Sequence, residues 1–113
     1  MSSREERVAH NEAMTRDINE DIEQAHTGAG ASTGEGGHVR VLCECGRLEC
    51  DRVIAITIAE YESVRADPRQ FAVVRDHVMA EVEQVVAQTD RYVVVAKREG
   101  TPAEIAIEQD PRA

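Results

Sequence analysis

The fold is decided by the stretch VRVLCECGRLECDRVIAI, residues 39–56. The chain has three cysteines, and all of them lie within eight residues at the centre of this stretch: Cys43, Cys45 and Cys50. Runs rich in β-branched residues, 39–42 and 52–56, flank the cysteines, and this pattern predicts two antiparallel strands with an elaborated turn between them. We therefore expect a β-hairpin whose turn carries three thiols.

Three thiols in so short a span indicate a metal site, because an odd number of cysteines cannot complete a disulfide framework. Structural Zn²⁺ has four tetrahedral ligands, and three cysteines with one histidine are a common set. The spacing C-x-C-x4-C differs from paired C-x2-C knuckles, so free buried thiols, a redox-active Cys43/Cys45 pair and an iron–sulfur cluster remain alternatives. We expect a turn at Gly46, where glycine permits a left-handed backbone.

A histidine is expected to supply the fourth ligand. Two of the four histidines belong to the N-terminal segment and would have to close a long loop to reach the cysteines. His38 is closer in sequence, but an extended strand would carry it roughly 16 Å from Cys43. His77 follows a β-branched run, 71–74, that could return beside the hairpin turn. We expect His77 to bind the metal, with His38 as the alternative and an ordinary surface role as the other interpretation of His77.

The rest of the compact part has recognisable signals. A capping box at Thr57-Ile58-Ala59-Glu60 predicts a helix over 57–66, and a proline at the first helical position predicts a short helix over 101–109. β-Branched runs predict strands at 71–74 and 91–96. Between them, the valines of 76–88 recur at helical spacing and predict a third short helix.

These signals divide the chain into three parts. Residues 1–26 form an N-terminal amphipathic helix, and residues 27–37, which hold five of the seven glycines, form a flexible Gly-rich linker. Residues 38–113 form a small α+β zinc-binding domain. The expected fold is a small antiparallel sheet with a zinc-stapled hairpin turn and short helices, preceded by the tethered N-terminal helix.

The N-terminal helix has a narrow apolar stripe at roughly helical spacing. Its main members are Val8, Met14, Ile18 and Ile22. In one interpretation the stripe folds back on the chain's own domain or pairs with a second copy as a homodimer. In the other, it enters a groove on a different protein, which makes these four residues the predicted partner-binding surface.

The composition argues against several classes of protein. The 113 residues carry 13 Lys and Arg against 22 Asp and Glu, a net charge of −9, which disfavours nucleic acid and favours a basic protein surface as partner. No apolar run is long enough to span a membrane, and no secretory signal is recognisable, so we expect no membrane association and a cytoplasmic protein. Only 3% of the residues are aromatic, so a zinc ion would supply stability that a small core lacks.

From the cysteines onward, the chain resembles an uncharacterised family of small actinobacterial-type proteins with a C-x-C-x4-C…His zinc module. The matching blocks are the cysteine cluster at 43–50, TIAEYESVR at 57–65, His77, EQVV at 83–86 and YVVVAK at 92–97. The resemblance implies a metal-binding module with His77 as the fourth ligand, and it implies no particular activity.

The predicted function is a non-enzymatic zinc-binding module for protein interaction, with a regulatory role as one option. The chain has no HExxH motif and no nucleophile elbow, and its glycines do not form a phosphate-binding loop. The alternatives are a labile zinc or thiol redox sensor, and a small zinc-dependent hydrolase whose fourth position holds water.

Overall fold

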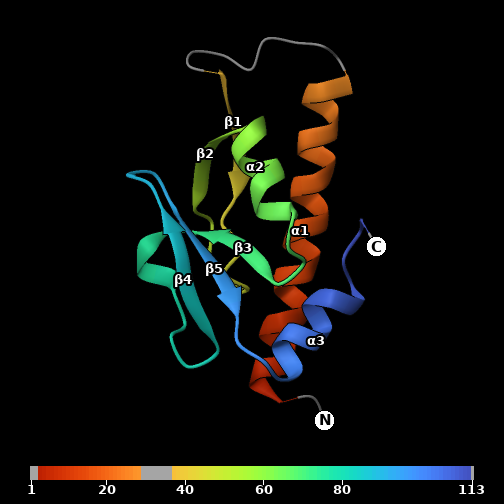
Figure 1. Cartoon of the computed structure of the whole chain (residues 1–113), viewed down its shortest axis with the longest axis vertical. Coiled ribbons are helices and arrows are strands. Elements are labelled where there is room, and N and C mark those ends of the chain that lie inside the picture. The colour runs from red at the N-terminus through yellow and green to blue at the C-terminus, as the bar shows by residue number, and fades with distance from the viewer. Residues whose placement is uncertain (1–2, 29–36, 113) are drawn as a thin grey trace.

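The computed structural model describes residues 3–28 and 37–112, and it is α+β, as predicted (Figure 1). Its elements in chain order are α1 (Arg4–Gly28), β1 (His38–Leu42), β2 (Val53–Thr57), α2 (Ile58–Arg65), β3 (Gln70–Val73), the 3₁₀ turn η2 (Arg75–His77), β4 (Glu83–Gln88), β5 (Val93–Lys97) and α3 (Thr101–Glu108). Most of the predicted linker, residues 29–36, lies outside the described residues. None of the described helices is long and apolar enough to cross a membrane.

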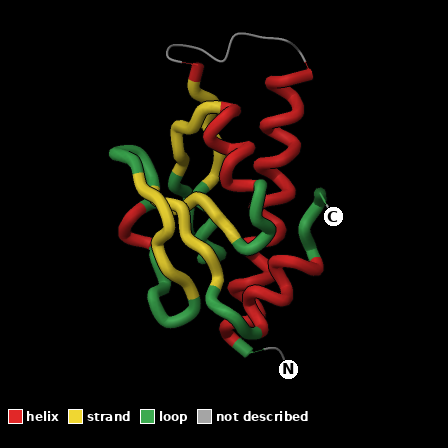
Figure 2. Tube along the Cα trace, viewed as in Figure 1, coloured by secondary structure: helices red, strands yellow, loops and turns green. Residues whose placement is uncertain are grey.

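The predicted hairpin is present. β1 and β2 pair antiparallel, with Val39 opposite Ile56 and Val41 opposite Ile54, and these four side chains are buried. A separate antiparallel sheet has the strand order β3-β5-β4. Figure 2 shows the strands on one side of the molecule and α1 running along the other.

The capping box that opens α2 is also confirmed. The Thr57 hydroxyl accepts a hydrogen bond from the backbone N–H of Glu60, and the Glu60 carboxylate accepts one from the N–H of Thr57. The same carboxylate pairs with Arg91 at 2.8 Å, which ties the start of α2 to the segment before β5. Local sequence thus decides where this helix begins, as capping preferences require.

The helix predicted over 76–88 is wrong. The one helical turn in this region is the short 3₁₀ turn η2. Residues 83–88 form the strand β4, which pairs with β5 and has a bulge between Val85 and Ala87. Valine is stiff about χ1 and fits a pleated strand better than a helix, so a partner strand overrides the weak helical spacing. Val85 and Val86 are about half exposed, which shows that these valines do not form one buried face.

The long helix α1 packs against α3 and β1, so it lies on the chain's own domain. This is one of the two arrangements that the sequence allowed, but only part of the apolar stripe faces the domain: Val8 and Ile22 are half-buried, whereas Met14 and Ile18 are exposed. The buried side chains of α1 are Ala9, Glu12, Ala13, Arg16, Asn19, Glu20 and Glu23. The helix therefore joins the domain mainly through polar groups that find partners there.

Candidate metal centre

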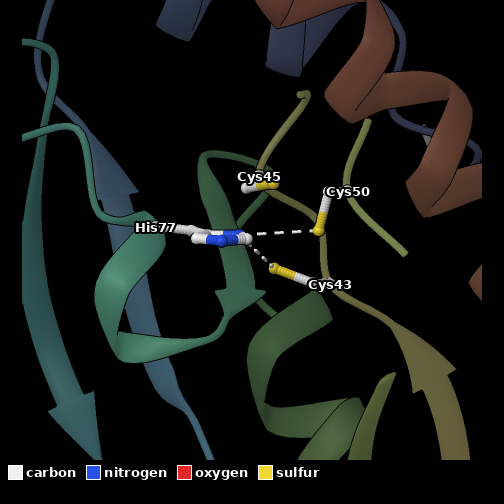
Figure 3. Close-up of side chains that lie close together, drawn as sticks. All are labelled: Cys43, Cys45, Cys50 and His77. Atoms are coloured by element: carbon white, nitrogen blue, oxygen red, sulfur yellow. Dashed lines mark hydrogen bonds between the residues drawn. The ribbon is translucent and has the colours of Figure 1, made fainter. Parts of the chain in front are cut away.

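Three thiols and one imidazole converge at the hairpin turn (Figure 3). One potential ligand atom from each of Cys43, Cys45, Cys50 and His77 lies within 4.8 Å of the other three. His77 Nδ1 is 3.7 Å from the sulfur of Cys43 and 3.5 Å from that of Cys50. A group of this composition and spacing can hold a metal ion. His38 stands at the start of β1 and does not belong to the group.

Two different parts of the chain bring these ligands together. Cys43 directly follows β1, and its N–H donates to the carbonyl of Arg52 across the hairpin. Val74, just after β3, donates its N–H to the Cys43 sulfur at 3.3 Å, and η2 then presents His77. Backbone N–H donors of this kind stabilise thiolate charge and orient the ligand.

The turn at Gly46 is present, with φ of 78°. This left-handed conformation suits glycine, which has no Cβ. After it, the N–H of Cys50 donates to the carbonyl of Arg47 at 3.2 Å, and this second turn returns the third thiol to the first two. The C-x-C-x4-C spacing thus corresponds to two consecutive turns.

The three thiols perturb one another. The pKa of Cys43 is raised because its thiol is held in a hydrogen bond with Cys45 and is buried, while that same bond lowers the pKa of Cys45 to about 5. Burial raises the pKa of Cys50. One sulfur is therefore readily ionised, and a bound cation would favour loss of the remaining protons.

Glu44, between two of the ligands, lies away from them and is fully buried. Its carboxylate accepts hydrogen bonds from the Asn19 side chain at 2.8 Å, the Ala72 N–H at 2.9 Å and the Tyr61 hydroxyl at 3.2 Å. It also pairs with Arg65 at 3.4 Å. The sequence pattern did not predict this role for Glu44, although the alternation of neighbouring side chains would place Glu44 opposite the thiols.

A second buried cluster was also missed by sequence analysis. Lys97 on β5 contacts Glu12 of α1 at 2.5 Å and Glu83 of β4 at 2.6 Å, and all three side chains are about 1% exposed. Burial raises the pKa of Glu12 to about 8, even though Lys97 acts in the opposite direction. Nothing in the local sequence pairs these residues, which are up to 85 positions apart.

The predicted partner-binding residues do not share one environment. Met14 is 63% exposed and Ile18 is 47% exposed. Val8 is half-buried beside Gly46, and Ile22 packs against the core cluster. Their role in binding a partner stays a prediction, and only Met14 and Ile18 present a large apolar surface.

Comparisons with protein-family models, with curated proteins and with solved structures found no match. The resemblance to small actinobacterial-type proteins therefore stays a prediction. The feature of the molecule that bears on function is the geometry of the four-residue group.

Proposed function

We propose that this chain is a non-enzymatic protein-interaction module held together by Zn²⁺ bound to Cys43, Cys45, Cys50 and His77. The observation that carries the proposal is the convergence of the four ligand atoms. With Zn–S of about 2.3 Å and Zn–N of about 2.0–2.1 Å, tetrahedral geometry requires S···N separations of about 3.6 Å. The two S···N distances of 3.7 and 3.5 Å are close to that value.

The composition of the group supports a structural role for the metal. Structural zinc sites are closed by four protein ligands, whereas catalytic sites keep a position for water or substrate. Four protein ligands would complete the zinc shell, so the zinc hydrolase alternative receives no support from this group. Structural zinc contributes about 10–16 kcal/mol of apparent binding free energy to the folding of small domains.

Metal analysis tests the proposal directly. Protein purified without added metal should contain close to one equivalent of zinc, and His77→Ala should lose at least tenfold in zinc affinity. His38→Ala is the matched control, because His38 lies outside the group, and it should bind zinc as the unaltered chain does. Protein that binds no zinc even when one equivalent is added, with three freely reacting thiols, would refute the proposal.

A labile redox site is a second candidate, favoured by the mutual proximity of the three sulfurs and the partial exposure of Cys50. Hydrogen peroxide would take two electrons from two thiolates, which join as a disulfide while the peroxide is reduced to two hydroxide ions and the metal is released. Zinc release at micromolar peroxide, reversed by a thiol reductant and added zinc, would support this function. Resistance to millimolar peroxide would exclude it.

The proposed interaction surface is the exposed part of the α1 stripe, around Met14 and Ile18. Both are large apolar side chains on the solvent side of a helix whose other face is buried. Helices often bind partners through residues at such spacing. The chain's net charge of −9 favours a partner with a basic surface around an apolar groove.

A further inference from the structure

The segment Leu42–Gly46 contacts the metal centre and α1 at the same time. Cys43 and Cys45 contribute thiols to the four-residue group. Leu42 and Glu44, which alternate with these cysteines, bond to Asn19 of α1. The Leu42 N–H donates to the Asn19 side-chain oxygen at 2.9 Å, and the Asn19 amide donates to the Leu42 carbonyl at 2.9 Å and to Glu44 at 2.8 Å. We call the five residues Leu42–Gly46 the ligand segment.

A second contact with α1 lies about two helical turns before Asn19. Asn11 donates its side-chain N–H to the Gly46 carbonyl at 3.1 Å. The Gly46 backbone is so close to α1 that a Cβ there would lie 2.5 Å from the Val8 carbonyl oxygen. The two ends of the ligand segment are therefore held against α1.

Other elements hold the middle of the segment on the α1 side. Tyr61 and Arg65 of α2 and the Ala72 N–H of β3 all contact the buried Glu44 carboxylate. If Glu44 turned away, these buried donors would lose their hydrogen-bond acceptor, which is unfavourable because water cannot replace it there. The ligand segment can therefore place its thiols correctly only while its opposite side is satisfied.

We propose that metal binding and α1 docking are energetically coupled through the ligand segment, with Asn19 and Glu44 as positioning residues of the metal site. This inference rests on the proposed zinc function and adds a regulation to it. Zinc fixes the ligand segment in the shape that α1 recognises, and docked α1 holds the thiols in the shape that zinc requires. By linkage, each event must favour the other by the same factor.

The coupling makes α1 a metal-controlled element. Loss of zinc lowers the affinity of the domain for α1, and the released helix stays covalently joined to the domain. Release exposes the polar face of α1 that carries Arg16, which is completely buried when the helix is docked. A partner that binds that face would therefore compete with the domain, and zinc would oppose it.

Limited trypsin digestion reports docking, because Arg16 is buried while Arg4 and Arg7 on the same helix are exposed. Cleavage of such a site follows the population of the open form. We expect cleavage after Arg16 to be at least tenfold faster with a zinc chelator than with one equivalent of Zn²⁺. Cleavage after Arg65, which is buried in the domain, controls for global unfolding: acceleration there by the same factor would mean that α1 is not released separately and would overturn the inference.

The reciprocal measurement uses zinc affinity by chelator competition. Asn19→Ala should weaken zinc binding by about 5–150-fold, the usual range of coupling between sites. Its Co²⁺-substituted form should keep the intense sulfur-to-cobalt absorption of three thiolate ligands, which shows that the ligands themselves are intact. Asp21→Ala, at an exposed position of the same helix, is the matched control and should leave zinc affinity unchanged.

The outcomes separate the two proposals. A wild-type chain that binds no zinc refutes the proposed function. A wild-type chain that binds zinc, with Arg16 cleavage the same in zinc and in chelator, refutes only the coupling. If Asn19→Ala does not fold, Asn11→Ala decides, because it removes one half-buried hydrogen bond to Gly46 and should weaken zinc binding by a smaller factor. Unchanged zinc affinity in that folded variant would overturn the inference.

Discussion

The two faces of α1 differ in a way that reverses the usual arrangement of an amphipathic helix. The face toward the domain buries Arg16 completely, whereas Met14 on the other face is 63% exposed. Arg16 donates to the carbonyls of Pro68 and Ala106, both at 2.8 Å, and its guanidinium lies 5.1 Å from the centre of the Phe71 ring. Burial here follows the availability of hydrogen-bond partners, since a paired polar group can be buried at low cost.

Removal of the Lys97 ammonium, which joins α1 to the β3-β5-β4 sheet, should have the largest effect on stability. Lys97→Met leaves Glu12 and Glu83 buried without their cation, and the free energy of unfolding should fall by about 3–5 kcal/mol. Urea denaturation measures this loss. Arg98→Met, at an exposed neighbouring position, is the control and should change stability by less than about 0.5 kcal/mol. Equal stability of the two variants would show that the polar face of α1 is not paired as described.

The contact between α1 and the ligand segment can be tested at two glycines. Gly46 and Gly100 both have positive φ, so alanine is strained at each by about 1–3 kcal/mol. Only at Gly46 would the new Cβ meet α1; at Gly100 the nearest atom is 4.0 Å away. Gly46→Ala should therefore destabilise the chain by about 1–3 kcal/mol more than Gly100→Ala. Equal losses in thermal denaturation would mean that α1 does not approach the turn so closely.

Acid should weaken a contact that lies away from α1. Arg91 donates to the Glu60 carboxylate and lowers its pKa to about 2. Because this pKa is depressed, the pair stabilises the folded chain above the unfolded value of about 4.5, and the contribution is lost as the pH falls toward 2. The loss should be roughly 1.5–3 kcal/mol.

Comparison of unfolding free energies at pH 6 and pH 3 measures this contribution. Glu60→Gln is the matched variant, because it keeps the side-chain shape and removes the titrating group. It should be less stable than the unaltered chain at pH 6 and should lose less stability on acidification. Identical pH profiles for the two chains would contradict the assignment.

The exposed face of α1 should give the smallest effect on stability. Met14→Ala and Ile18→Ala should change the free energy of unfolding by less than about 0.5 kcal/mol, as expected for exposed positions. The same changes should abolish binding of any partner that uses this face, which a pull-down with the intact chain as reference would detect. A large loss of stability in either variant would show that the substituted side chain is buried and not exposed.

The elements that the sequence predicted correctly depend on local chemistry. β-Branched runs on both sides of a turn specified the β1–β2 hairpin, and the capping box specified the start of α2, because the interacting residues are only a few positions apart. The spacing of the thiols and the polar junction after 71–74 pointed to the group that the structure brings together. The helix predicted from the valines of 76–88 was wrong, because pairing with β5 outweighs a weak helical period.

By itself, the sequence determined the hairpin, its cysteine-rich turn and the short capped helix α2, since each is set by neighbours along the chain. Tertiary structure alone decided which face of α1 is buried, where Glu44 points and how Lys97 is paired. The physical reason is that a polar side chain can be buried only where distant groups satisfy it, and those groups become neighbours only when the chain has folded.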